Sequence, residues 1–242
     1  MEKTVTEAIK YRRSVRMYKD DVELDDAKVR QCLLNASLAP TSSNLQLWEF
    51  YHVTTNEKRA AISKACFDQP ASKTAKQLVV IVTRKDLWKK RAKANLDFLQ
   101  ASFANKPIDQ YTQRDKFALN YYKKLIPTLY TDFLGIIGGI KYCFFQIIGL
   151  FRPIYRQVRN SDLRIVAHKS AGLAAQNFMT SMAAIGYDTC PMEGSDTLMI
   201  KRVLGLPRKA EINMVIGCGV REEKGIYGPR FRVPFEEVYK KV

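Results

Sequence analysis

The stretch Leu78-Val-Val-Ile-Val-Thr83 decides the fold of this chain. A continuous apolar run of this length is typical of a central strand that is buried on both faces. Because both faces of such a strand need a covering layer, we expect helices above and below a sheet. Two further runs have strand character, the aromatic and β-branched residues 48–53 and residues 212–217. A short fourth strand is expected near residues 187–190.

Helical patterns occupy most of the remaining chain. Apolar residues recur at helical spacing in segments covering residues 4–11, 25–38, 58–65, 86–104, 161–185 and 196–204. The segment 161–185 is the longest, and Leu163, Leu173 and Met182 lie close to one stripe of it. Alanines beside this stripe would let neighbouring helices approach closely, which suits a central or interface helix.

The composition excludes some classes of protein and leaves others open. The chain has 242 residues, 46% of them hydrophobic, and a formal charge of +16, so it is no disordered basic tail. Residues 84–169 hold 17 Lys or Arg and six Asp without any Glu, so most of the excess charge lies there. A positive potential suits nucleic acid, an acidic membrane surface or a phosphate-bearing ligand. No nucleic-acid motif accompanies the charge, so we expect no nucleic-acid partner.

The five cysteines point to a reducing compartment. They lie far apart, and neither their odd number nor their spacing suits a disulfide framework. The N-terminal residues lack the apolar core of a secretory signal. We therefore expect a cytoplasmic protein, with possible peripheral contact at the inner membrane face, and we predict no metal site.

The segment 133–151, FLGIIGGIKYCFFQIIGLF, is unusually apolar and leaves three interpretations open. It could be a buried insertion or a subunit contact. It could also lie on an anionic membrane, because Arg152, Arg156 and Arg159 follow it directly. Its length approaches that of a spanning helix, although Lys141 near its middle would cost about 3 kcal/mol in a bilayer.

Two arginine clusters are candidate phosphate ligands. The first is Arg12-Arg-Ser-Val-Arg16, just after a short helix, and the second is Arg230-Phe-Arg232. Guanidinium groups match phosphate oxygens, and alternate side chains of an extended segment point the same way. Taken singly, each cluster could equally be a solvated basic surface.

Two further segments carry polar groups that could contact a ligand. The loop 40–46 offers small hydroxyls and amides that could bind a polar heterocycle, or it is an ordinary connection. Residues 190–194, with the sequence CPMEG, lie where a strand ends and a helix is about to begin. Backbone N–H groups in such a place can face a ligand.

In this order and spacing, the four patterns resemble the nitroreductase-like family of FMN-dependent oxidoreductases. The resemblance runs through RRSVR, APTSSNLQLWEF, AAQNFMTSMAAIGYDTCPMEGSD and GPRFRVPFEEV, and the middle of the chain, about 100–160, shows no match. It implies an α+β fold with three α/β/α layers and a central mixed, largely antiparallel sheet. It also implies a homodimer with exchanged C-terminal arms. We expect one domain over residues 1–242, with an apolar and basic insertion at about 100–160.

The resemblance also implies roles for particular residues. The FMN phosphate would be held by Arg12, Arg230 and Arg232, with Arg13 and Ser14 at the phosphate and ribityl chain and Arg16 at the pyrimidine edge. The partner subunit would line the flavin from the other side through residues equivalent to Pro40, Thr41, Ser42 and Asn44. Four residues would lie along the isoalloxazine: Pro191, Met192, Glu193 and Gly194. The Glu193 N–H would point at N5, and Gln69 is the nearest candidate for an expected amide.

The activity implied by the resemblance is a ping-pong reaction. NADH or NADPH reduces FMN by hydride transfer to N5, and a nitroaromatic, quinone or similar flat acceptor then takes the electrons. No catalytic side chain is expected, because the flavin carries the chemistry, and neither His52 nor His168 lies in a matched motif. One departure is Gln46-Leu47-Trp48, where the family usually has Gln-Pro-Trp. An alternative is a membrane-surface flavoprotein or a basic binding module whose residues 84–169 dock on an anionic surface.

Overall fold

The centre of the molecule is a four-stranded sheet. The computed structural model describes residues 2–133 and 135–242. The strands lie in the order β1 (Trp48–Val53), β2 (Gln77–Thr83), β4 (Glu211–Gly219) and β3 (Asp188–Met192), and neighbours pair antiparallel. Every residue of β2 is buried, which confirms the central strand predicted from the apolar run. The predicted sheet was mixed, and its parallel pairing is an isolated bridge between Ser14 and Thr189 of β3.

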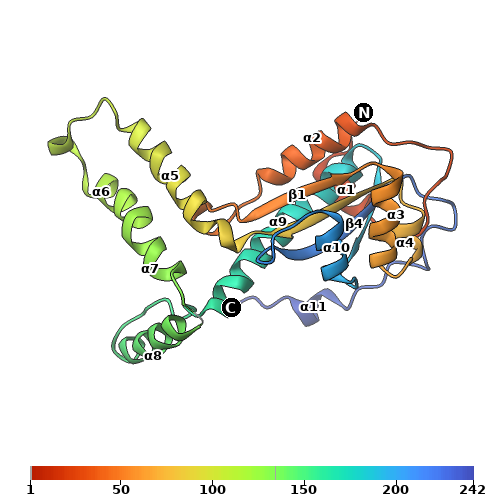
Figure 1. Cartoon of the computed structure of the whole chain (residues 1–242). Helices are drawn as coiled ribbons and strands as arrows, with labels where there is room; N and C mark the ends of the chain where they lie inside the picture. The colour runs from red at the N-terminus through yellow and green to blue at the C-terminus, as the bar shows by residue number, and fades with distance from the viewer. Residues whose placement is uncertain (1, 134) are drawn as a thin grey trace.

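Helices cover both faces of the sheet, so the predicted three-layer α+β fold is confirmed (Figure 1). One layer contains α1 (Val5–Tyr11), α2 (Asp26–Ser37) and α9 (Asn160–Ala184), and the other contains α3 (Asn56–Ala65), α4 (Pro70–Lys73) and α10 (Thr197–Val203). Alternate residues of β2 point into the two layers. Val79 and Ile81 pack with α2 and α9 in one core, whereas Leu78 and Val80 pack with α3 and α10 in the other.

The helix α9 buries Leu163 and Met182 of the predicted stripe but not all of it. Its alanines at 171, 174 and 175 are fully buried with Phe178 against the sheet, whereas Leu173 is 49% exposed. Leu173 belongs to the predicted stripe but stays open to solvent within one chain, which leaves the interface alternative for this helix open. Close packing is the physical reason for the buried alanines, because the alanines on the sheet-facing side let the helix lie near the strands.

A helical arm extends from one end of the sheet (Figure 1). It contains α5 (Trp88–Ser102), α6 (Gln113–Asn120), a π-helical turn (Tyr121–Leu125), α7 (Ile126–Tyr130) and α8 (Ile136–Phe151). A small apolar cluster joins the arm to the body and includes Leu47, Ala92, Ile126 and Leu163. Leu47, the departure from the usual proline, is thus a buried contact between body and arm.

The helix α8 makes up most of the apolar segment 133–151, and Leu134 is outside the described residues. Within residues 2–133 and 135–242, every helix is either too short or too polar to traverse a bilayer. Ile140, Phe144 and Leu150 are exposed along α8. The interpretation of this segment as buried within the chain is therefore wrong for one whole face of the helix.

Candidate functional site

The first arginine cluster lies along an edge of the sheet. After α1 ends, the chain runs beside β3, where Val15 N–H donates to Thr189 O at 3.2 Å. Arg16 N–H donates to Gly225 O at 2.7 Å. Val15 is fully buried in the core, so the side chains of its neighbours Ser14 and Arg16 project to the opposite side of this extended segment.

The second arginine cluster returns to the first from the far end of the chain. Arg13 donates to Gly228 O at 2.9 Å. Arg230 donates to Lys10 O at 2.9 Å and also to the backbone oxygen of Arg12. Guanidinium-to-carbonyl hydrogen bonds therefore hold together two segments that are more than 200 positions apart in the sequence.

A cavity of about 250 Å³ lies between the two clusters. Its lining residues are Arg12, Arg13, Ser14, Arg16, Ile226, Tyr227, Pro229, Arg230, Phe231 and Arg232. Five of them are arginines, and none of the lining residues that the structure describes is acidic. We name this site the arginine cavity. Charge of one sign around a concave site attracts a ligand of the opposite sign, so the site is built for an anion.

The electrostatics of the arginine cavity lead to the same conclusion. Burial lowers the pKa of the half-buried Arg12, and the charges of Arg230 and Arg232 lower it further. Beneath them lies the Cys190 thiol, whose pKa is raised by burial and lowered in part by Arg16 and Arg12. Like charges held this close destabilise one another, and a bound anion would relieve the repulsion.

The segment that follows Cys190 becomes exposed once β3 ends. Pro191 and Met192 end β3, and Glu193 and Gly194 are exposed. The Gln69 side chain donates to Gly194 O at 3.4 Å, so Gln69 lies beside this segment. The side chain of Met192 is buried in the core, so only its backbone can face a ligand.

The loop 40–46 is not part of the arginine cavity in this chain. Pro40, Ser42 and Asn44 are exposed, and Ser42 N–H donates to Ser170 Oγ of α9 at 3.4 Å. Positive φ angles are found at Ser43, Asn44 and Gln46. Such angles are strained for residues with a Cβ, so surrounding contacts must hold the loop in place.

These contacts come from the helical arm, and the sequence carried no motif that indicated them. Ser43 Oγ lies 2.7 Å from the Tyr121 hydroxyl, and Tyr122 donates to Ser43 O at 3.0 Å. Asn44 donates to Asn95 Oδ1 at 2.8 Å, and Asn95 donates back to Asn44 O at 3.0 Å. The π-helical turn at Tyr121–Leu125 therefore places two tyrosines on one strained loop.

The histidines have structural partners outside these segments. His52 Nε2 lies 2.7 Å from Gln77 Oε1, and His168 lies between Glu211 and Asn213 at 3.2 and 3.0 Å. Within the described residues, no three His, Cys, Asp or Glu side chains cluster as a metal site would require.

Known proteins are similar to this chain over most of its length. A model described as the nitroreductase family matches residues 9–220. Protein DrgA of Synechocystis is 26% identical over 217 residues, which are 90% of this chain and 84% of that protein. A protein of Exiguobacterium sibiricum solved in complex with FMN superposes with a TM-score of 0.68 and 21% identity. The match covers 99% of this chain and 98% of that one. The NADPH:FMN oxidoreductase of Vibrio harveyi, complexed with NAD⁺, superposes with a TM-score of 0.61 and 16% identity. The match covers 98% of this chain and 76% of that one.

Proposed function

The chain belongs to the nitroreductase family, and from that premise we propose that it is an FMN-dependent NAD(P)H oxidoreductase. We propose flat acceptors, such as nitroaromatics or quinones, as its oxidising substrates. The observation that carries the proposal is the arginine cavity, with five arginines and no described acidic residue in its lining. The FMN bound to the Exiguobacterium protein and the cofactors of the Vibrio enzyme support it.

The arginine cavity suits the phosphate end of FMN. Three of its five guanidiniums, those of Arg12, Arg230 and Arg232, would hold the phosphate, since a guanidinium can donate two parallel hydrogen bonds to phosphate oxygens. Arg13 and the exposed Ser14 would contact the phosphate and the ribityl chain. An FMN phosphate carries the negative charge that relieves the repulsion around Arg12.

FMN, when bound, would supply the redox chemistry between NAD(P)H and the acceptor, with hydride transfer at N5. Arg16 would lie at the pyrimidine edge, where a fixed positive charge favours the reduced form. Glu193 would donate its backbone N–H to N5. Pro191 and Gly194 would lie along the ring, and the open space above Gly194 leaves room for it. Gln69, bonded to Gly194 O, would hold that segment in position.

The flavin site would be completed by a second copy of the chain. The loop 40–46 lies outside the arginine cavity, so Pro40, Thr41, Ser42 and Asn44 would reach a flavin held by the partner. Two observations support a homodimer. Ile165 and Leu173 are each 49% exposed on α9, and residues 229–242 are all exposed, as an arm that wraps a partner would be when seen in one chain. We place this dimer in the cytoplasm, in keeping with five free thiols.

The proposed function is tested by flavin content and reduction. The purified protein is expected to be yellow, with about one FMN per chain, and to bleach when NADH or NADPH is added without oxygen. Turnover of both nucleotides against a quinone and a nitroaromatic would then identify the acceptor class. Colourless protein that cannot be reconstituted with FMN would refute the proposal.

The tyrosines that hold the loop 40–46 give a second prediction. Removing both hydroxyls, as Tyr121→Phe with Tyr122→Phe, deletes two hydrogen bonds worth about 1 kcal/mol each. The strained loop is then less well held, and we expect the dissociation constant of FMN to rise about tenfold. Titration of the apoprotein with FMN measures this.

The matched control for this pair is Tyr51→Phe, which deletes a hydroxyl bonded to Glu49 at 3.2 Å in the body of the protein. Its FMN affinity is expected to stay within twofold of the parent chain. Equal affinities in the double variant and the control would show that the arm does not position the loop.

A further inference from the structure

The helix α8 presents a continuous apolar face to solvent. The exposed residues on this face follow helical periodicity and are Ile136, Ile140, Cys143, Phe144, Ile147, Leu150 and Phe151. Ile140 is 67% exposed, Phe144 59% and Leu150 77%. We name this set the α8 stripe. None of its members is polar or charged, and contiguous apolar surfaces of this kind mark interaction sites.

The opposite face of α8 is anchored, so the α8 stripe is held outward. Asp132 accepts hydrogen bonds from Gly135 N–H and Gly138 N–H at 3.1 and 2.8 Å, close to the start of the helix. Lys141 turns back to donate to Leu129 O at 3.2 Å. At the other end, Arg156 donates to Gln146 Oε1 at 2.6 Å and to the backbone oxygens of Gln146 and Gly149. A cation there suits the negative end of the helix dipole.

The surroundings of the α8 stripe are basic. Residues 123–159 contain six Lys or Arg and one acidic residue, Asp132. Asp132 is already engaged with backbone N–H groups. Lys123, Lys124 and Arg152 are exposed. The apolar face is thus accompanied by positive charge from before the helix to beyond its end.

We propose that the α8 stripe docks on an anionic lipid surface. The 16 residues of α8 measure about 24 Å, less than the roughly 30 Å thickness of a bilayer's hydrocarbon core. The helix would therefore lie parallel to the membrane surface, with its apolar face toward the lipid chains. Basic residues beside an apolar face are what anionic headgroups favour. In Figure 1, α8 is the green helix at the lower left, below α7 and away from the sheet.

A second copy of the chain is a poorer occupant of the same face. A symmetric contact through two α8 stripes would bring like regions of the two chains together. Each copy would contribute six basic residues and one engaged carboxylate from residues 123–159, so the charges would repel. The lipid proposal goes beyond the proposed redox function and uses none of the residues assigned to FMN, so each can fail separately.

Vesicle flotation tests the proposal. The FMN-loaded protein is expected to float with phosphatidylcholine vesicles containing about 30 mol% phosphatidylglycerol, and less with phosphatidylcholine alone. Raising NaCl from about 0.05 to about 0.5 M should weaken binding, because salt screens the headgroup charge. Ile140→Asn, Phe144→Asn and Ile147→Asn together should reduce bound protein about tenfold. The control variant carries three asparagines at Val5, Phe67 and Leu198, which are exposed outside the arm. Its binding to the vesicles should equal that of the parent chain.

A fluorophore on Cys143 provides an independent readout. Cys143 is the exposed cysteine, whereas the other four are buried, so an environment-sensitive thiol dye reports on the α8 stripe. Anionic vesicles should shift its emission to the blue. The same dye on Ser102→Cys in a Cys143→Ser background, on α5, should not respond.

Several outcomes would overturn the proposal. No flotation of the parent chain at low salt would do so, as would equal flotation of the triple α8 variant. A triple variant that becomes monomeric, while the parent chain binds no vesicles, would identify the α8 stripe as a subunit contact instead.

Discussion

Replacing Arg12 and Arg230 together with alanine is expected to weaken FMN binding about 10³-fold. Both guanidiniums line the arginine cavity, and the bond from Arg230 to the backbone of Arg12 places them side by side. A hydrogen bond to a charged group is worth about 1.5–3 kcal/mol. Loss of one such bond from each arginine therefore amounts to about 4 kcal/mol, or three powers of ten in the dissociation constant.

The choice of ligand makes this prediction sharper. If the arginines hold the phosphate, the parent protein binds FMN more tightly than riboflavin, which lacks it. The double alanine variant should lose that preference while keeping its weak affinity for riboflavin. Arg12→Lys with Arg230→Lys keeps the positive charge but removes the paired N–H donors of the guanidinium. Its loss of FMN affinity should lie between those of the parent chain and the double alanine variant. Titrations of apoprotein with each flavin measure all of these values.

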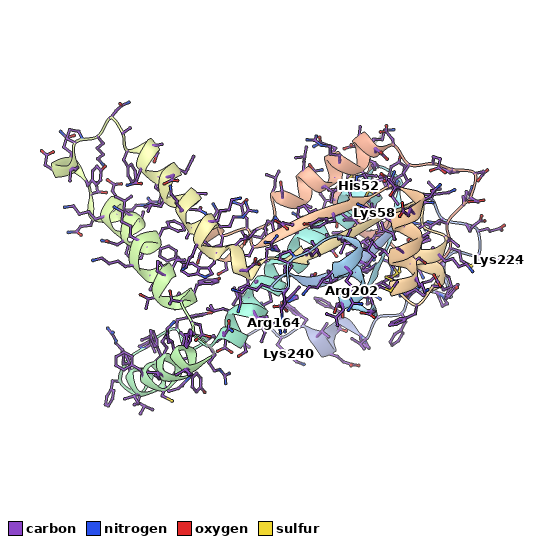
Figure 2. The ribbon with its side chains drawn as sticks, viewed as in Figure 1. His52, Lys58, Arg164, Arg202, Lys224 and Lys240 are labelled. Carbon is purple, nitrogen blue, oxygen red and sulfur yellow. The ribbon has the colours of Figure 1, made fainter. Side chains whose placement is uncertain are left out.

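Arg202→Ala is the matched control for the arginine variants. Arg202 is an exposed arginine of α10 and is not part of the lining of the arginine cavity (Figure 2). Its removal should leave FMN affinity unchanged. Circular dichroism and thermal unfolding of each variant separate loss of ligand from loss of fold. Unchanged flavin occupancy in a folded double alanine variant would show that the phosphate is held elsewhere.

Patterns in the sequence predicted the sheet well because burial on two faces leaves a local signature. All seven residues of β2 are buried, and a run of apolar residues is the direct consequence. Helix α9 was harder, since residues of similar hydropathy occur on both of its faces. Ala171 and Ala174 pack inward and Leu173 does not, because the space between helix and sheet, rather than hydropathy, decides which side chain fits.

The candidate site could be predicted only where residue patterns carried a resemblance. Nothing local to Arg12 or Arg230 indicates that they meet, yet the resemblance grouped them and the structure places them at one cavity. The anchoring of Ser43 by Tyr121 and Tyr122 was missed, since those tyrosines lie almost 80 positions away in a region that matches no family motif. The apolar pattern of α8 likewise could not show which of its faces is free.

The last ten residues are expected to hold the dimer together. In residues 233–242, Val233, Phe235, Val238 and Tyr239 expose 45%, 64%, 68% and 51% of their surface in one chain. Fully burying a side chain of this size gains about 1.5–3 kcal/mol. Partial burial of the four against a partner would total about 4 kcal/mol, so deleting residues 233–242 should weaken dimerisation about 10³-fold. Arg230 and Arg232 remain in the truncated chain.

Loss of the dimer should also release FMN, because the loop 40–46 would reach the flavin only from a partner subunit. Light scattering and flavin absorbance across a dilution series are expected to show monomer appearing and FMN leaving together. Phe235→Asn with Val238→Asn should reproduce most of the loss at full chain length. Lys240→Ala with Lys241→Ala, exposed on the same segment, should not; Lys240 is labelled in Figure 2. A truncated chain that stays dimeric, or a monomer that keeps its FMN, would contradict the exchanged arm.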